Sequence, residues 1–186
     1  MTPSGRRSAT ARAWLLTLAA VLTLGACGGG SQGDPANGGQ PLPTPQQSPS
    51  TGTASTVALL SNELAGGGFQ MLPPSAPYRP SEPASLTQTP RTIFQIYGSD
   101  ADQGFVVIYD FATEAAAAAA GTELASYLGS GFGQTNFPLD AQFSVTQVGS
   151  TVVSTWYSGA RASDPDRARE AFLAVGSVGQ PFPVVK

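Results

Sequence analysis

The sequence predicts an α+β domain in which helices pack mainly on one face of an antiparallel four-stranded sheet. Two pairs of short apolar segments are each interrupted by turn residues, a segment with helical features follows each pair, and another helical segment precedes both. The expected order is therefore a helix, a long loop, and then strand–strand–helix twice. This domain is expected to span residues 56–186 as one globular unit.

The first helix is expected at the start of this domain. Apolar residues recur there at helical spacing, and three glycines at 66–68 then end the pattern (Val57, Leu59, Leu60, Leu64). The stretch 72–90 that follows carries six prolines. Because proline lacks a backbone donor, this stretch is excluded from a central strand or a helix interior, and a long irregular loop is predicted.

Four strands are expected, in two hairpins. The first hairpin joins 92–97 to 104–109 through a loop rich in glycine, serine and aspartate. The second joins 142–148 to 151–157 through the two-residue turn Gly149-Ser150. In the last strand, side chains alternate between the two faces of the sheet, and the pattern favours Trp156 toward the helices and Tyr157 toward the opposite side.

A helix is expected after each hairpin. The segment 113–128 includes six consecutive alanines, with Thr113 as a cap and Gly129 as the stop. The last helix is predicted to begin at Asp164, which a proline follows at the first helical position, and to end at Gly176.

The N-terminal residues 1–26 have the parts of a secretory signal peptide. Basic residues without any acid precede a run of 12 apolar or small residues at 13–24 (Arg6, Arg7, Arg12). A membrane-spanning helix needs about 20 apolar residues, so a permanent span is not expected.

Leu24-Gly25-Ala26-Cys27 resembles the lipobox of bacterial lipoproteins. The resemblance covers residues 1–27 and implies cleavage between Ala26 and Cys27, with diacylglyceryl attached to the Cys27 thiol. It therefore implies membrane lipid as a partner and a location on the cell membrane or outer membrane, facing outside the cytoplasm. Cys27 is the only cysteine, so it has no intramolecular disulfide partner.

Residues 27–55 are rich in glycine, proline and serine and are expected to form a disordered tether behind the lipidated cysteine. The chain without residues 1–26 has 6 basic and 12 acidic residues, a net charge of −6. This balance opposes nucleic-acid binding, which requires clustered Lys and Arg. The order of elements also has a weak resemblance to small extracytoplasmic domains of uncharacterised bacterial lipoproteins, which implies no activity.

The composition excludes several catalytic mechanisms. The chain contains no histidine, and its only lysine is Lys186. Ser-His-Asp and Cys-His catalysis and zinc sites built from His and Cys are therefore excluded, and we expect no cofactor. Carboxylate chemistry remains, with four candidates that also suit turns and solvated surface (Asp100, Asp102, Asp110, Asp140). Asp100 and Asp102 are also weak candidates for a calcium loop, although hairpin loops favour the same residues.

Aromatic residues on the expected strands suggest a binding face, formed by Tyr97, Tyr109, Trp156 and Tyr157. The alternative is that the proline-rich loop covers the second face of the sheet. The leading hypothesis is a non-enzymatic, membrane-anchored domain that binds an envelope protein or a ligand. Two alternatives stay open: a carboxylate-dependent hydrolase acting on envelope glycans, and a purely structural protein.

Overall fold

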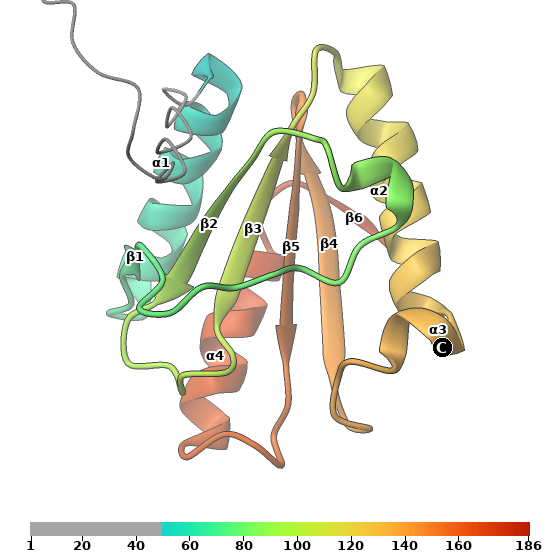
Figure 1. Cartoon of the computed structure of the whole chain (residues 1–186). Coiled ribbons are helices and arrows are strands. Elements are labelled where there is room, and N and C mark those ends of the chain that lie inside the picture. Colours follow the sequence, from blue (N-terminus) through green and yellow to red (C-terminus); the bar gives the residue numbers. More distant parts are fainter. Residues whose placement is uncertain (1–49) are drawn as a thin grey trace, which may run out of the picture. The chain divides into compact units, whose positions relative to one another are not determined.

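The computed structural model describes residues 50–186. The elements, in chain order, are α1 (Thr51–Gly66), β1 (Met71–Leu72), η1 (Ala84–Leu86), β2 (Arg91–Ile96), β3 (Phe105–Asp110), α2 (Glu114–Gly129), α3 (Gly131–Gln134), β4 (Gln142–Val148), β5 (Thr151–Tyr157), α4 (Pro165–Gly176) and β6 (Gln180–Phe182) (Figure 1). Ala26, Cys27, the expected signal segment and the tether up to residue 49 lie outside the described residues. No helix within 50–186 has the length and apolar character that crossing a membrane requires.

The sheet has six strands in the order β1-β2-β3-β5-β4-β6, and every neighbouring pair is antiparallel. The four predicted strands are present as β2, β3, β4 and β5, but the prediction of a four-stranded sheet is wrong. The two additional strands lie at the edges, where Met71 pairs with Ile96 and Phe182 pairs with Val145. They are two and three residues long, too short to produce a readable alternation of apolar and polar residues.

The helices cover both faces of the sheet, so the prediction that they pack mainly on one face is also wrong. One apolar cluster joins α1 and α4 to Val106 and Ile108, while the other joins α2 to Val107 and Tyr109. Phe105 through Tyr109 are all buried because β3 is central and has a helix layer on each side. A strand covered on both faces has a continuous apolar run rather than an alternating one.

The helix ends follow the expected capping chemistry. Thr113 and Asp164 accept hydrogen bonds from backbone amides of α2 and α4, at 3.1 and 3.0 Å. Helix α1 begins earlier than the expected domain start at Thr56, because Ser50 caps it by accepting from the Thr53 amide at 3.1 Å. Residues 51–55, which the sequence predicts to be part of the tether, therefore belong to α1.

The proline-rich segment, residues 73–90, crosses the face of the sheet that carries α2 (Figure 1). It is irregular except for the single turn η1, as its prolines predict. Leu86 anchors it in the α2 core, and the Tyr78 ring stacks on Phe105 with centroids 3.9 Å apart. The segment therefore covers part of the second face of the sheet. This is the alternative to a binding face formed by the aromatic strand residues.

Candidate functional site

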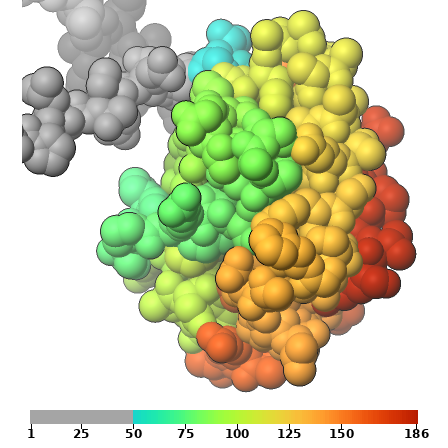
Figure 2. Space-filling view, turned by 45° about the vertical axis from the view of Figure 1, so that its right-hand side comes forward, coloured from blue at the N-terminus to red at the C-terminus, as the bar shows by residue number. Residues whose placement is uncertain are grey.

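A cleft of about 660 Å³ opens between the proline-rich segment and the connection from α2 to β4. In Figure 2 these two walls are the neighbouring green and orange surfaces. Ligand sites in proteins commonly enclose about 300–1,000 Å³, so the cleft has the size of a small-molecule site. It is lined by Tyr78, Arg79, Pro80, Ser81, Glu82, Thr87, Asp102, Tyr127, Thr135, Asn136, Phe137, Pro138, Trp156 and Arg161.

Aromatic rings form the apolar part of the cleft. Trp156 comes from β5 and is only 9 % exposed. The Phe137 ring meets the Trp156 ring edge to face, with centroids 5.3 Å apart, and meets Phe143 in the same manner at 4.7 Å. This edge-to-face packing fixes the orientation of the Trp156 ring.

The indole nitrogen of Trp156 is a buried donor without a hydrogen-bond partner in the described residues. The Tyr78 hydroxyl lies near the indole nitrogen, and this contact opposes, without cancelling, the rise that burial causes in the pKa of Tyr78. The two groups do not reach hydrogen-bond geometry. A buried N–H without a partner costs about 1–3 kcal/mol.

The buried carboxylate of Glu82 joins the proline-rich segment to the sheet. Its Oε1 accepts from the Arg91 guanidinium at 2.7 Å, and its Oε2 accepts from the Tyr109 hydroxyl at 2.7 Å. The Glu82 side chain is 6 % exposed and that of Arg91 is 25 % exposed. Both oxygens of Glu82 thus have charge-assisted or hydroxyl partners, which suits a positioning role.

The two tyrosines beside Glu82 stay protonated across the physiological pH range. Burial raises the pKa of Tyr78 to about 12, and the charge of Glu82 adds to the effect. Burial, together with the hydrogen bond to Glu82, raises the pKa of Tyr109 still further above its ordinary value. Tyr78 therefore presents a neutral hydroxyl to the cleft.

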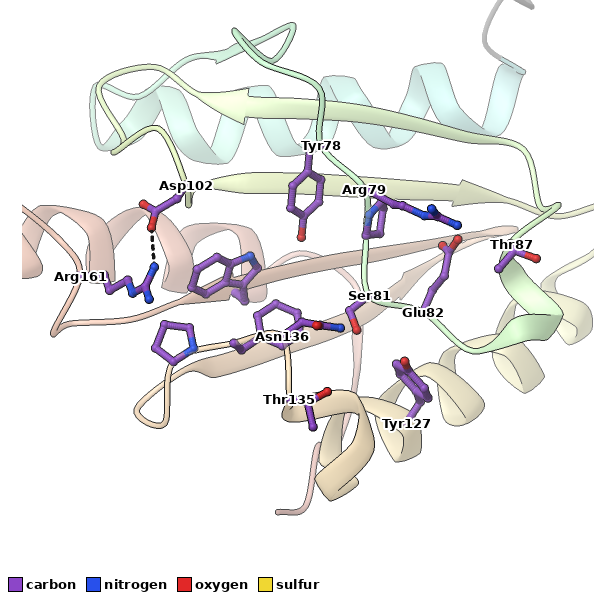
Figure 3. A pocket seen from close by; sticks show the side chains of 14 residues that line it. Tyr78, Arg79, Ser81, Glu82, Thr87, Asp102, Tyr127, Thr135, Asn136 and Arg161 are labelled. Atoms are coloured by element: carbon purple, nitrogen blue, oxygen red, sulfur yellow. Dashed lines mark hydrogen bonds and ion pairs between the residues drawn. The ribbon is translucent and has the colours of Figure 1, made fainter.

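An ion pair between Arg161 and Asp102 borders the other end of the cleft, at 3.1 Å, and both side chains are more than half exposed (Figure 3). Buried Gln103 holds this end in place. The side-chain NH₂ of Gln103 donates to the Asp100 carboxylate at 3.2 Å, and its side-chain carbonyl accepts from the Ser158 backbone amide at 3.3 Å. The β2–β3 hairpin is thereby tied to the loop after β5.

The four aromatic residues of the expected binding face lie in four different environments. Trp156 lines the cleft, while Tyr109 is fully buried beneath it. Tyr157 lies on the opposite face, where its ring contacts Phe172 of α4 and its hydroxyl donates to the Pro165 carbonyl at 3.1 Å. Trp156 and Tyr157 do point to opposite faces, but each faces a helix layer.

Tyr97 is 70 % exposed and borders a second, smaller cavity of about 270 Å³ at the end of β2. The other walls of this cavity come from Gly68 and Phe69, which follow α1, and from the start of α4. The Arg167 guanidinium lies 3.8 Å from the centre of the Phe69 ring. Tyr97 is therefore separate from the cleft.

Two of the acidic candidates accept hydrogen bonds from backbone amides. Asp100 accepts from the Ser163 amide at 3.0 Å, and Asp140 accepts from the Ala160 amide at 2.9 Å. These backbone hydrogen bonds are the main reason that the pKa values of both carboxyls fall below the ordinary range. A glycosidase general acid needs a raised pKa, so Asp100 and Asp140 do not suit that role.

The remaining acidic candidates are Asp102 and Asp110. Asp102 is paired with Arg161, and Asp110 ends β3 with its backbone paired to Thr151. Within residues 50–186, no three acidic side chains are close enough together to hold a metal ion. The weak calcium candidates Asp100 and Asp102 are thus occupied by protein donors.

Several cleft residues were not predicted from the sequence, among them Tyr78, Arg79, Glu82 and Asn136. One signal could have found the first three. A loop as long as 73–90 within a small domain is uncommon and often functional, and these three residues interrupt its prolines with an aromatic ring and two charges. No comparable signal marks Asn136.

The fold and the cleft together define an α+β domain with a candidate small-ligand site on one face of a six-stranded antiparallel sheet. No protein-family model, no curated protein and no solved structure matches the chain.

Proposed function

We propose that this chain is a lipid-anchored extracytoplasmic binding protein whose cleft holds a small polar ligand. The lipobox-like sequence ending at Cys27 supports the anchor. The observation that carries the binding function is a cleft of about 660 Å³ whose walls combine aromatic rings with the charged side chains of Arg79, Glu82, Asp102 and Arg161. Such a mixture of apolar surface and a few fixed polar groups is typical of ligand sites.

Binding is favoured over hydrolysis because the carboxylates that line the cleft already form hydrogen bonds and ion pairs within the protein. Glu82 accepts from Arg91 and Tyr109, and Asp102 is paired with Arg161. A hydrolytic pair needs one carboxyl free to donate a proton and another free to attack or to activate water. The neutral Tyr78 hydroxyl and the Arg79 guanidinium, which also line the cleft, suit recognition instead.

The anchor is tested by changing Cys27 to Ser in the full chain. The expected result is a shift from the membrane fraction to a soluble or unprocessed form, because a serine cannot receive the thioether-linked diacylglyceryl group that holds the protein durably. Fractionation by ultracentrifugation and the intact mass of the product measure this. A Cys27→Ser protein that keeps both its membrane fraction and its mass would remove the anchor from the proposal.

The cleft is tested with a ligand that stabilises the folded state. A library of small organic acids, alcohols, amines and sugars is screened for compounds that raise the Tm of the full chain, since binding to the folded form alone stabilises it. Asn136→Trp, at an exposed cleft position, should abolish the shifts by filling the space. Ser61→Trp, at an exposed position of α1, is the matched control and should leave them unchanged.

The binding function fails if no compound raises the Tm, or if the compounds that do so act equally on the Asn136→Trp variant. Retained helix and strand content by circular dichroism ensures that the Asn136→Trp protein is folded when it is compared.

A further inference from the structure

Three large apolar side chains have greater exposed fractions than any other in residues 50–186. Leu139 is 104 % exposed, and Phe132 and Val185 are each 76 % exposed. Single exposed apolar residues are common on protein surfaces, whereas several at one place mark a contact with another protein or with a membrane. The placement of these three side chains therefore decides what they can do.

The last residues of the chain bring the three side chains to one corner of the domain, which we call the apolar corner. The Val185 carbonyl lies directly against Gly129, at the end of α2, and Phe132 follows Gly129 by three residues. The Lys186 ammonium donates to the carbonyl of the residue just before β4, and Leu139 lies two residues earlier. Figure 1 shows the end of the chain beside α3, and in Figure 2 the orange surface of this region adjoins the red surface of the last residues.

The segments that form the apolar corner contain few charges. Residues 124–141 and 180–186 carry only two charged side chains, those of Asp140 and Lys186, and the two have opposite signs. Removing a charge from water is costly, so a surface with few charges suits contact with the apolar part of a bilayer. The same scarcity provides no excess of positive charge to attract anionic lipid head groups.

The chain between the proposed anchor and the domain is long enough to bring the apolar corner to the lipid surface. Residues 28–49 separate Cys27 from Ser50, the cap of α1, and a chain of this length spans up to about 75 Å when fully extended. Helix α1 begins near the opposite end of the sheet, where Thr56 contacts Thr151 of β5 at 2.8 Å. Strand β4 runs from that end to the corner and is about 24 Å long, so the reach exceeds the distance to be covered.

We propose that the apolar corner rests on the bilayer that holds the Cys27 lipid, with Phe132, Leu139 and Val185 placed among the upper parts of the acyl chains. This inference rests on the proposed lipid anchor and adds a second contact with the same membrane. The anchor favours this contact over one with a separate protein, because a second contact with a surface that already holds the chain is intramolecular. Burial of three large apolar side chains then favours one orientation of the domain over the others.

The test measures where residue 139 lies when the lipidated full chain is inserted in phosphatidylcholine vesicles. Leu139→Cys is labelled with the fluorophore NBD, and some of the lipids carry a doxyl quencher on an acyl chain. In the proposed anchor the Cys27 thiol is blocked by its lipid, so only the introduced cysteine reacts. Leu173→Cys, at an exposed position of α4, is the matched control. The quenched fraction at residue 139 should be at least about three times that at residue 173, because interfacial apolar groups lie about 5–10 Å deep.

Two double variants show whether the neighbouring apolar side chains hold residue 139 in the bilayer. Phe132→Ser/Val185→Ser should lower the quenching at residue 139 to the level at residue 173, since each large side chain that enters lipid shifts the docking equilibrium by about tenfold or more. Leu59→Ser/Leu72→Ser, at exposed positions outside the corner, is the matched control and should leave the quenching unchanged. Addition of phosphatidylglycerol to the vesicles should not increase the quenching, because the corner has no excess of positive charge. Circular dichroism ensures that the variants compared are folded.

Equal quenching at residues 139 and 173 in vesicle-bound chain would overturn the docking while keeping the anchor. A chain that does not associate with the vesicles would overturn both. Strong quenching at residue 139 that survives in Phe132→Ser/Val185→Ser would also overturn the proposal, because the corner would then not be the surface that enters the bilayer. If the label at residue 139 is unquenched but its emission is blue-shifted only at high protein density, a second copy of the chain covers the corner in place of lipid.

Discussion

Truncation of Trp156 to alanine should lower the free energy of unfolding by about 3 kcal/mol, near the lower end of the range for large aromatic core deletions. The side chain is 9 % exposed and is packed against Phe137, so its removal leaves a void in the aromatic floor. We expect the lower end because one side of the ring borders the cleft, from which water can enter. Urea unfolding followed by far-UV circular dichroism measures the change.

Fluorescence provides a second measurement on the same residue. In the full chain with Trp14→Phe, the emission of Trp156 should be blue-shifted and poorly quenched by iodide. Tyr97→Ala is the matched control, since Tyr97 is also an aromatic residue at a strand end but is 70 % exposed, and its truncation should cost no more than about 0.5 kcal/mol. Red-shifted, readily quenched emission together with a near-neutral Trp156→Ala would place the tryptophan outside the core.

The local elements of this fold were predictable because their signals lie within a few residues of one another. The turn at Gly149 adopts a positive φ of 56°, which glycine tolerates, and so joins the second predicted hairpin. Caps at Thr113 and Asp164 mark the starts of α2 and α4 in the sequence as they do in the structure. These features depend on backbone chemistry and need no information from distant residues.

The layer arrangement was less predictable, because it depends on which side chains each helix finally covers. The continuous apolar run from Phe105 to Tyr109 was a sign that β3 is covered on both faces, but a loop or a helix can supply such a cover equally well. In the structure, α1 and α4 cover one side, whereas α2 and the proline-rich segment share the other. The short edge strands β1 and β6 are defined by their pairing with β2 and β4.

The cleft was the least predictable feature, since its residues come from separate parts of the chain. Tyr78, Asn136, Trp156 and Arg161 lie in four segments that only the fold brings together. The expectation that aromatic residues on strands form a site was useful at one residue, Trp156. It did not extend to Tyr109 or Tyr157, because strand aromatics in a sheet with two covered faces serve mainly as core.

Replacement of Glu82 by leucine should lower the free energy of unfolding by about 3 kcal/mol, as expected when one partner of a buried ion pair is removed. The loss leaves the Arg91 guanidinium and the Tyr109 hydroxyl without the acceptor that each contacts at 2.7 Å. We expect the lower end of the range of about 3–5 kcal/mol, because Arg91 is 25 % exposed and water can solvate it in part. Glu63→Leu, at an exposed position of α1, is the matched control and should change stability by no more than about 0.5 kcal/mol.

The origin of that loss is tested by removing the partners as well. The triple variant Glu82→Leu/Arg91→Met/Tyr109→Phe should recover most of the stability, to within about 1 kcal/mol of the unmodified chain, because apolar groups of similar size can replace a buried polar network at little cost. Hydrogen exchange should show that amides of residues 73–90 lose protection in Glu82→Leu and regain it in the triple variant. If the triple variant is as unstable as the single one, the attraction within the network, rather than the stranded partners, holds the proline-rich segment on the sheet.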